Sequence, residues 1–170
     1  LFAPAALEAE LAGLPLLPRT AEQGAAAVVA GDLGEGWDFP TLNRAFRLLH
    51  ANPDARLIAL GMTRFWMGPD GVTLDLAPFV KALEHAADRE AVVLGKPAQA
   101  FFHSAAAKLG MPPAELLMIG DDVKTDVGGA QAAGLRGALV RTGKFRELDL
   151  DGDVRPDIVL DSLANAPRLF

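Results

Sequence analysis

The sequence contains no cysteine, which excludes disulfide bonds and thiolate-bound zinc and is typical of a reducing compartment. It has no basic excess, because 16 Lys and Arg residues stand against 22 Asp and Glu residues, for a net charge of −6. Nucleic acid and anionic membrane surfaces are therefore poor partners. No apolar run approaches the roughly 20 residues that a membrane span requires, and Glu8 and Glu10 stand where a signal peptide has basic residues. We expect a cytoplasmic protein that binds neither nucleic acid nor membrane.

What is present is an ordinary globular composition over 170 residues, 51% of them hydrophobic and 22% charged, which is enough for one large domain or two small ones. Short apolar segments alternate with amphipathic ones, which predicts an α/β fold with mainly parallel strand pairing. Strands are predicted at 25–30, 56–60, 63–67, 72–74, 91–94, 117–120, 137–141 and 157–160. Helices are predicted at 4–12, 41–50 with Thr41 as its cap, 78–87, 99–109, 127–133 and 162–169.

Charged residues follow two of the predicted strands. Lys96 follows the first in VVLGKP, and Asp121, Asp122 and Asp126 follow the second in LLMIGDDVKTD. Ligands of parallel α/β sheets bind at the carboxyl ends of strands, so we expect both segments to open into one crevice. Three carboxylates so close together repel one another, and a lysine can neutralise them or hold a phosphate. Clustered carboxylate oxygens also suit Mg²⁺.

Each of these features has a plainer interpretation when it is taken alone. The aspartates are also typical of a turn that caps the next helix, and Lys96 of a solvated residue after a strand. Arg141 and Lys144 follow another predicted strand, where they either add positive potential to the crevice or lie at the surface. The combination of Lys96 with the three aspartates, in this order and spacing, is much more specific than any of its parts.

The two segments resemble motifs of the haloacid dehalogenase (HAD) superfamily of phosphatases. GKP resembles the third motif, and GDDVKTDVGGAQAAG the fourth. LNRAFRLL, LIALGMTRFW, DGVTLDLAPFVKALEHA and VRTGKF resemble the class IIA branch, which has a large α/β cap of the C2 type. The resemblance implies a Rossmann-like core with an inserted cap. By it, residues 1–92 are the cap domain and residues 93–170 the C-terminal half of the core.

The resemblance also implies roles for individual residues. Lys96 is expected to contact a nucleophilic aspartate and the phosphoryl group, and Asp121 to bind Mg²⁺. Asp122 and Asp126 are expected to complete or support that metal site. The implied reaction is phosphatase chemistry on a small phosphorylated compound or pyrophosphate through an aspartyl-phosphate. Arg64 is expected to face the substrate from the cap, although a hairpin that packs its own aromatic residues explains this stretch as well. Caps of this branch also suggest a homodimer.

The nucleophile motif of the family, DxDG followed by Thr or Val, does not precede the predicted cap. LDLDGDV offers Asp149 and Asp151 downstream, but the charged KFREL before it does not predict a buried strand, and its position would require circular permutation. It also fails as a calcium loop, since Val154 and Leu160 stand where Gly and Glu are needed. We therefore expect a truncated enzyme, inactive by itself and marginally stable or self-associating. The alternative is a non-catalytic binding or dimerisation module with a degenerate fold.

Overall fold

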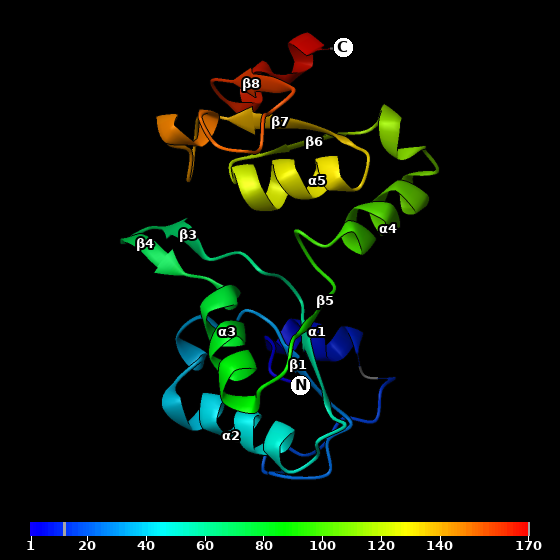
Figure 1. The fold of residues 1–170 in the computed structure, drawn as a ribbon, viewed down its shortest axis with the longest axis vertical. Helices are drawn as coiled ribbons and strands as arrows, with labels where there is room; N and C mark the ends of the chain where they lie inside the picture. Colours follow the sequence, from blue (N-terminus) through cyan, green and yellow to red (C-terminus); the bar gives the residue numbers. More distant parts are fainter. Residues whose placement is uncertain (12, 170) are drawn as a thin grey trace. The chain divides into compact units, whose positions relative to one another are not determined.

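The computed structural model describes residues 1–11 and 13–169, so the predicted helix end at Ala12 and the predicted domain end at Phe170 lie outside the described residues. The chain forms two compact units (Figure 1). The first comprises residues 1–65 and 74–94, and the second residues 66–73 and 95–170. The break after residue 94 lies close to the predicted boundary, while the assignment of cap to 1–92 and core to 93–170 stays a prediction.

The first unit is built on a parallel sheet in the order β1 (Ala27–Ala30), β2 (Arg56–Ala59) and β5 (Val92–Val93). Its helices are α1 (Ala5–Glu10), α2 (Phe39–His50) and α3 (Leu76–Ala87), with a short 3-10 turn η1 (Gly34–Gly36). α2 and α3 each bury one apolar stripe, including Leu49 of α2 and Val80 of α3, against the sheet residues Val28 and Leu57. The alternation of helix and parallel strand confirms the predicted α/β class.

The N-terminus of α2 corrects one expectation. Thr41 was the predicted cap, but α2 begins two residues earlier and Asp38 is its N-cap residue. The Asp38 side chain accepts a hydrogen bond from the Thr41 backbone N–H at 2.9 Å. Pro40 then stands in the first turn, where its missing N–H leaves no unmade helical bond. Asp38, and not Thr41, is therefore the N-cap residue of this helix.

The predicted turn at 68–71 joins a hairpin of β3 (Phe65–Gly68) and β4 (Gly71–Leu74). Gly71 has φ +116°, a backbone angle that favours glycine. Trp66 and Met67 are exposed on this hairpin. The hairpin predicted for TRFWMGPDGV is therefore present, but the exposed Trp66 does not fit the expectation that the hairpin packs its own aromatic residues.

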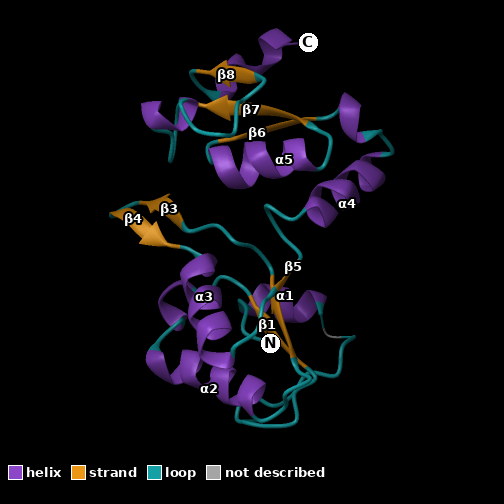
Figure 2. Ribbon diagram, in the orientation of Figure 1, coloured by secondary structure: helices purple, strands orange, loops and turns teal. Residues whose placement is uncertain are grey.

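The second unit carries a parallel sheet in the order β6 (Leu117–Gly120), β7 (Arg136–Val140) and β8 (Ile158–Leu160) (Figure 2). β7 is the middle strand, and its residues from Gly137 to Val140 are buried, whereas all four residues of β6 are half-buried. The helix α4 (Gln99–Leu109) ends at Gly110, which has φ +66° as expected of a helix-ending glycine. The unit also contains η2 (Pro113–Glu115), η3 (Val123–Gly128), α5 (Gly129–Ala132), η4 (Glu147–Leu150) and η5 (Leu163–Leu169).

One further expectation about elements was wrong. The helix predicted at 127–133 begins at Val123, because six residues of π-helix (η3) precede the short α5. The strand before Lys96, β5, pairs with β2 in the first unit and does not share a sheet with β6. The two charged segments therefore follow strands of different sheets. The predicted helix at 162–169 is a 3-10 helix containing Pro167.

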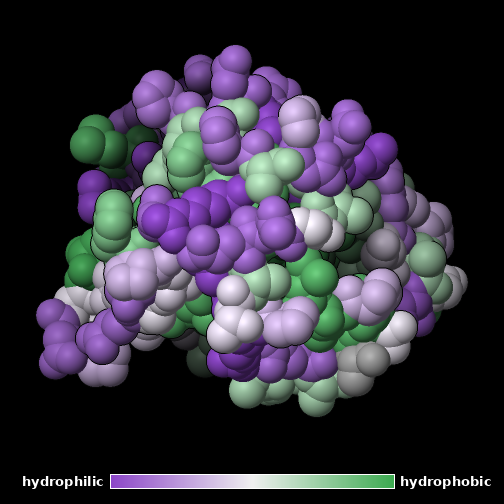
Figure 3. Space-filling view, turned by 90° about the horizontal axis from the view of Figure 1, so that it is seen from below, coloured by the Kyte–Doolittle hydropathy of each residue, from purple (hydrophilic) through white to green (hydrophobic). Residues whose placement is uncertain are grey.

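The surface is mixed in character. Figure 3 shows hydrophilic side chains interspersed with small groups of hydrophobic ones on one face of the molecule. Within the described part of the chain, no helix combines the length and the apolar character that a bilayer crossing demands.

Candidate functional site

The site lies where β6 ends, in the second unit. Gly120 is the last residue of β6, so Asp121 and Asp122 stand at its carboxyl end, and η3 then carries Asp126 back toward the strand. The ammonium group of Lys96 lies 2.7 Å from Oδ1 of Asp126. The Asp126 side chain is only 5% exposed, whereas that of Lys96 is 37% exposed. Lys96 therefore has one partner inside the protein and keeps access to solvent.

A glycine at position 120 is required by the close approach of Asp126. A Cβ at this position would lie 2.2 Å from Oδ2 of Asp126, which is far below a van der Waals contact. The same oxygen accepts a hydrogen bond from the Asp122 backbone N–H at 3.2 Å. The missing side chain thus allows the buried carboxylate to pack directly on the end of the strand.

Asp122 organises the start of η3. Its Oδ1 accepts hydrogen bonds from the backbone N–H groups of Lys124 and Thr125, each at 3.0 Å, so the capping interpretation is correct for this residue. Its Oδ2 lies 2.6 Å from the ammonium of Lys144. Burial raises the pKa of Asp122, but the hydrogen bonds from Lys144 and Thr125 outweigh burial and hold that pKa below its ordinary value. Asp122 is therefore ionised at neutral pH.

Asp121 is held by the loop that follows β7. Its Oδ2 accepts a hydrogen bond from the Lys144 backbone N–H at 2.9 Å. Gly143, just before Lys144, has φ +63°, and a Cβ there would lie 2.0 Å from the same oxygen. The backbone of this loop thus lies in direct contact with Asp121, and it fixes one oxygen of this half-buried carboxylate.

Two lysines, rather than one, offset the repulsion among the three aspartate carboxylates. Lys96 pairs with Asp126, and Lys144 pairs with Asp122. Among the described residues, no three or more His, Asp or Glu side chains are grouped as a metal centre. Mg²⁺ needs only one or two protein carboxylates, with waters and a substrate phosphate as its other ligands. Asp121 fits best as a protein carboxylate for Mg²⁺. Its Oδ2 accepts a hydrogen bond from a backbone N–H, whereas Asp122 and Asp126 each pair with a lysine ammonium.

Lys144 is the site residue that sequence reasoning left undecided. Its position after β7, the strand next to β6, was the available signal, because neighbouring parallel strands end at the same edge of a sheet. The other candidate from that loop, Arg141, pairs instead with Glu147 and stacks over Phe145 with 5.1 Å between Cζ and the ring centroid. One of the two cations therefore points into the site, and the other lies at its surface.

The remaining predicted residues belong to other elements of the chain. Arg64 belongs to the first unit, where its Cζ lies 5.8 Å from the centroid of the Phe65 ring, and its substrate contact stays a prediction. Asp149 belongs to η4, and its Oδ2 accepts a hydrogen bond from the Arg146 backbone N–H. The rejected nucleophile candidate is thus part of a short local turn.

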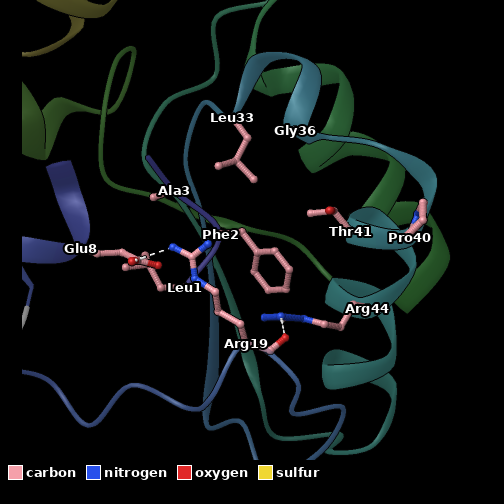
Figure 4. Close-up of a pocket in the computed structure, with 10 residues that line it drawn as sticks. All are labelled: Leu1, Phe2, Ala3, Glu8, Arg19, Leu33, Gly36, Pro40, Thr41 and Arg44. Atoms are coloured by element: carbon pink, nitrogen blue, oxygen red, sulfur yellow. Dashed lines mark hydrogen bonds and ion pairs between the residues drawn. The ribbon is translucent and has the colours of Figure 1, made fainter. Parts of the chain in front are cut away.

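A separate cavity of about 430 Å³ lies in the first unit (Figure 4). Arg44 stacks over the Phe2 ring with 4.5 Å between Cζ and the centroid and donates a hydrogen bond to the Arg19 carbonyl. Arg19 in turn pairs with Glu8 at 2.8 Å. Burial, followed by repulsion from Arg19, lowers the pKa of Arg44. Each of these two guanidinium groups thus has a partner inside the cavity, and none of the predicted site residues lines it.

The second unit thus combines a parallel sheet with a lysine that pairs with a buried aspartate near the end of a strand. Residues 93–166, which carry both charged segments, match the HAD-hydrolase-like family. This part of the chain belongs to that family, as its motifs suggested.

Similar proteins cover most of the chain. It is 44% identical over 138 residues to phospholysine phosphohistidine inorganic pyrophosphate phosphatase of Xenopus laevis, covering 81% of this chain and 50% of that protein. The structure of a 4-nitrophenylphosphatase from Thermotoga maritima matches 98% of this chain and 64% of its own, with TM-score 0.82 and 25% identity. A glycerol phosphate phosphatase from Mycobacterium tuberculosis, in complex with calcium, matches 93% of this chain and 47% of its own, with TM-score 0.75 and 28% identity. The chain spans about half the length of the curated relatives it matches.

Proposed function

We propose that the chain is part of a Mg²⁺-dependent phosphatase that hydrolyses a small phosphorylated compound or pyrophosphate through an aspartyl-phosphate. The observation that carries this proposal is the contact between Lys96 and the buried Asp126 at the end of β6. The names of the relatives, which include a pyrophosphate phosphatase and a glycerol phosphate phosphatase, support the substrate class. The attacking carboxylate belongs to a DxDG motif that does not precede the predicted cap in residues 1–170.

Each residue has a distinct task in this proposal. Lys96, anchored by Asp126 and partly exposed, offers its ammonium to the phosphoryl oxygens and to the attacking carboxylate. Asp121 supplies a carboxylate oxygen for Mg²⁺, and Asp122 and Asp126 support the site around it. Bound Mg²⁺ would neutralise charge on the transferring phosphoryl group. Because Asp126 is buried and bound to Lys96, the ammonium stays fixed while substrates exchange.

The proposal extends to the surroundings of the reaction. Arg64 contacts the substrate from the cap, the cap residues 1–92 form a homodimer contact, and the enzyme acts in the cytoplasm. The alternative, a non-catalytic binding or dimerisation module, is less well supported, because it gives no reason for the Lys96–Asp126 pair or for the named activities of the relatives.

Phosphate release by the intact protein tests the assigned roles. We expect Lys96→Ala and Asp121→Ala each to lower kcat/KM by about 10²-fold or more, as loss of a group that stabilises transition-state charge does. Lys124→Ala is the matched control, because it removes an exposed lysine next to the same segment. Melting curves show whether each variant is folded. Activity that survives both Lys96→Ala and Asp121→Ala would overturn the assignment.

A further inference from the structure

Lys144 connects the two loops that follow neighbouring strands. It stands in the loop after β7, and its ammonium reaches Oδ2 of Asp122, in the loop after β6, at 2.6 Å. The two side chains are only 10% and 16% exposed. Removing two charges from water is costly unless their mutual geometry is good. The pair therefore acts as a rigid link between the loops and not as a loose surface contact.

The same residue also holds the neighbouring aspartate. Its backbone N–H donates to Oδ2 of Asp121 at 2.9 Å, and the absence of a side chain on Gly143 permits this approach. The Lys144 ammonium thus fixes Asp122 while its amide fixes Asp121. Movement of the Lys144 side chain away from Asp122 would free the loop whose amide orients Asp121.

We propose that Lys144 is a positioning residue, which orients Asp121 for metal binding by anchoring the Gly143–Lys144 loop to Asp122. This inference rests on the proposed function, in which Asp121 binds Mg²⁺. The effect that it predicts on Mg²⁺ affinity is opposite to the effect that simple electrostatics predicts. A nearby cation repels Mg²⁺, so charge alone predicts that removal of Lys144 tightens metal binding. Positioning predicts that removal weakens it.

Titration of Mg²⁺ into the intact protein by calorimetry separates these effects. We expect Lys144→Met to weaken Mg²⁺ binding about 10-fold, the lower end of the effect of removing a group that orients a metal ligand. Lys124→Met removes an equal charge from an exposed side chain in η3, the element that carries Asp126. We expect the Mg²⁺ affinity of this variant to be unchanged or tighter. Lys144→Arg, which keeps the charge and part of the contact, is expected to lie between Lys144→Met and the unaltered protein.

Mg²⁺ binding by Lys144→Met that is as tight as, or tighter than, that of the unaltered protein overturns the inference. If Lys144→Met does not fold, Lys144→Gln tests the same link, because its shorter, neutral side chain loses the ion pair with Asp122. A folded Lys144→Gln with unaltered affinity also overturns the inference. The expected binding pattern in a protein that releases no phosphate would refute the proposed function alone. An active protein in which Lys144→Met leaves affinity unchanged would refute this inference alone.

Discussion

At the scale of single residues, the site depends on backbone positions that have no room for a side chain. Gly120 lies against Asp126 and Gly143 against Asp121, so two of the three carboxylates of the site pack on a glycine. These glycines matter for the space they leave rather than for flexibility alone. Gly120 shows this most directly, because its φ is not in the positive range that favours glycine.

Gly120→Ala is expected to destabilise the protein by about 1–3 kcal/mol, the usual cost of forcing extra volume into a packed site. The added Cβ would lie 2.2 Å from Oδ2 of Asp126, so the carboxylate that anchors Lys96 must move. Urea denaturation measures the change. Gly61→Ala is the control, because a Cβ there has no heavy atom within 4 Å and Gly61 has no positive φ. Equal stability of the two variants would contradict the packing argument.

Asp157 gives a prediction about pH. The Gly137 backbone N–H and then the Gln131 side chain hydrogen-bond to its carboxylate and lower its pKa. A folded-state pKa below the unfolded value adds stability at neutral pH, and this stability is lost as pH falls through the folded-state pKa. Asp157→Asn should therefore lower Tm at pH 7 but have progressively less effect as the pH falls below about 4, near the unfolded value of an aspartate.

Thermal melts of Asp157→Asn and the unaltered protein across this pH range test the expectation. Asp153→Asn, which removes a carboxylate from an exposed position nearby, is the matched control and should change Tm little at any pH. A Tm difference for Asp157→Asn that stays constant from pH 7 to strongly acidic pH would refute the linkage.

At the scale of elements, helix starts were harder to predict than helix faces. The apolar spacing of 41–50 and 78–87 identified α2 and α3 correctly, because burial on one side imposes a 3.6-residue period. The residue at which a helix begins depends on which side chain accepts hydrogen bonds from the free backbone N–H groups of its first turn. Several polar residues near each helix start could do so. Asp38 and Asp122 both take it in this protein.

The cap of α2 can be tested by paired substitutions. We expect Asp38→Ala to lower Tm more than Thr41→Ala, because the Asp38 carboxylate accepts the Thr41 N–H while the Thr41 backbone survives its own substitution. Far-ultraviolet circular dichroism during melting follows the loss of helix. A larger decrease in Tm for Thr41→Ala would restore the cap assignment that sequence alone suggested.

At the scale of the whole molecule, β6 carries the site on an incompletely covered strand. It is the end strand in the order β6-β7-β8, and its four residues are half-buried although they are apolar or glycine. β7, covered on both sides, is buried from Gly137 onward. An uncovered apolar strand edge favours pairing with another chain.

The polypeptide of residues 1–170 is therefore expected to be marginally stable or to self-associate. Size-exclusion chromatography with light scattering over a range of concentrations measures association, and calorimetry measures the cooperativity of melting. A monodisperse monomer that melts in one sharp, cooperative transition would contradict this expectation.

The sequence by itself determined the α/β class and pointed to the family, and it predicted the residues of the candidate site. The period of apolar residues reflects burial, and the third and fourth motifs are short enough to be recognised without a fold. Only the tertiary structure decided that β5 and β6 belong to different sheets, that Asp122 caps η3, and that Lys144 rather than Arg141 reaches the aspartates. The contact between Lys144 and Asp122 joins residues 22 positions apart, and local pattern holds no information about contacts of that kind. The Asp122 cap is local, but the sequence offers several aspartates for it, and only the structure shows which of them accepts the free N–H groups.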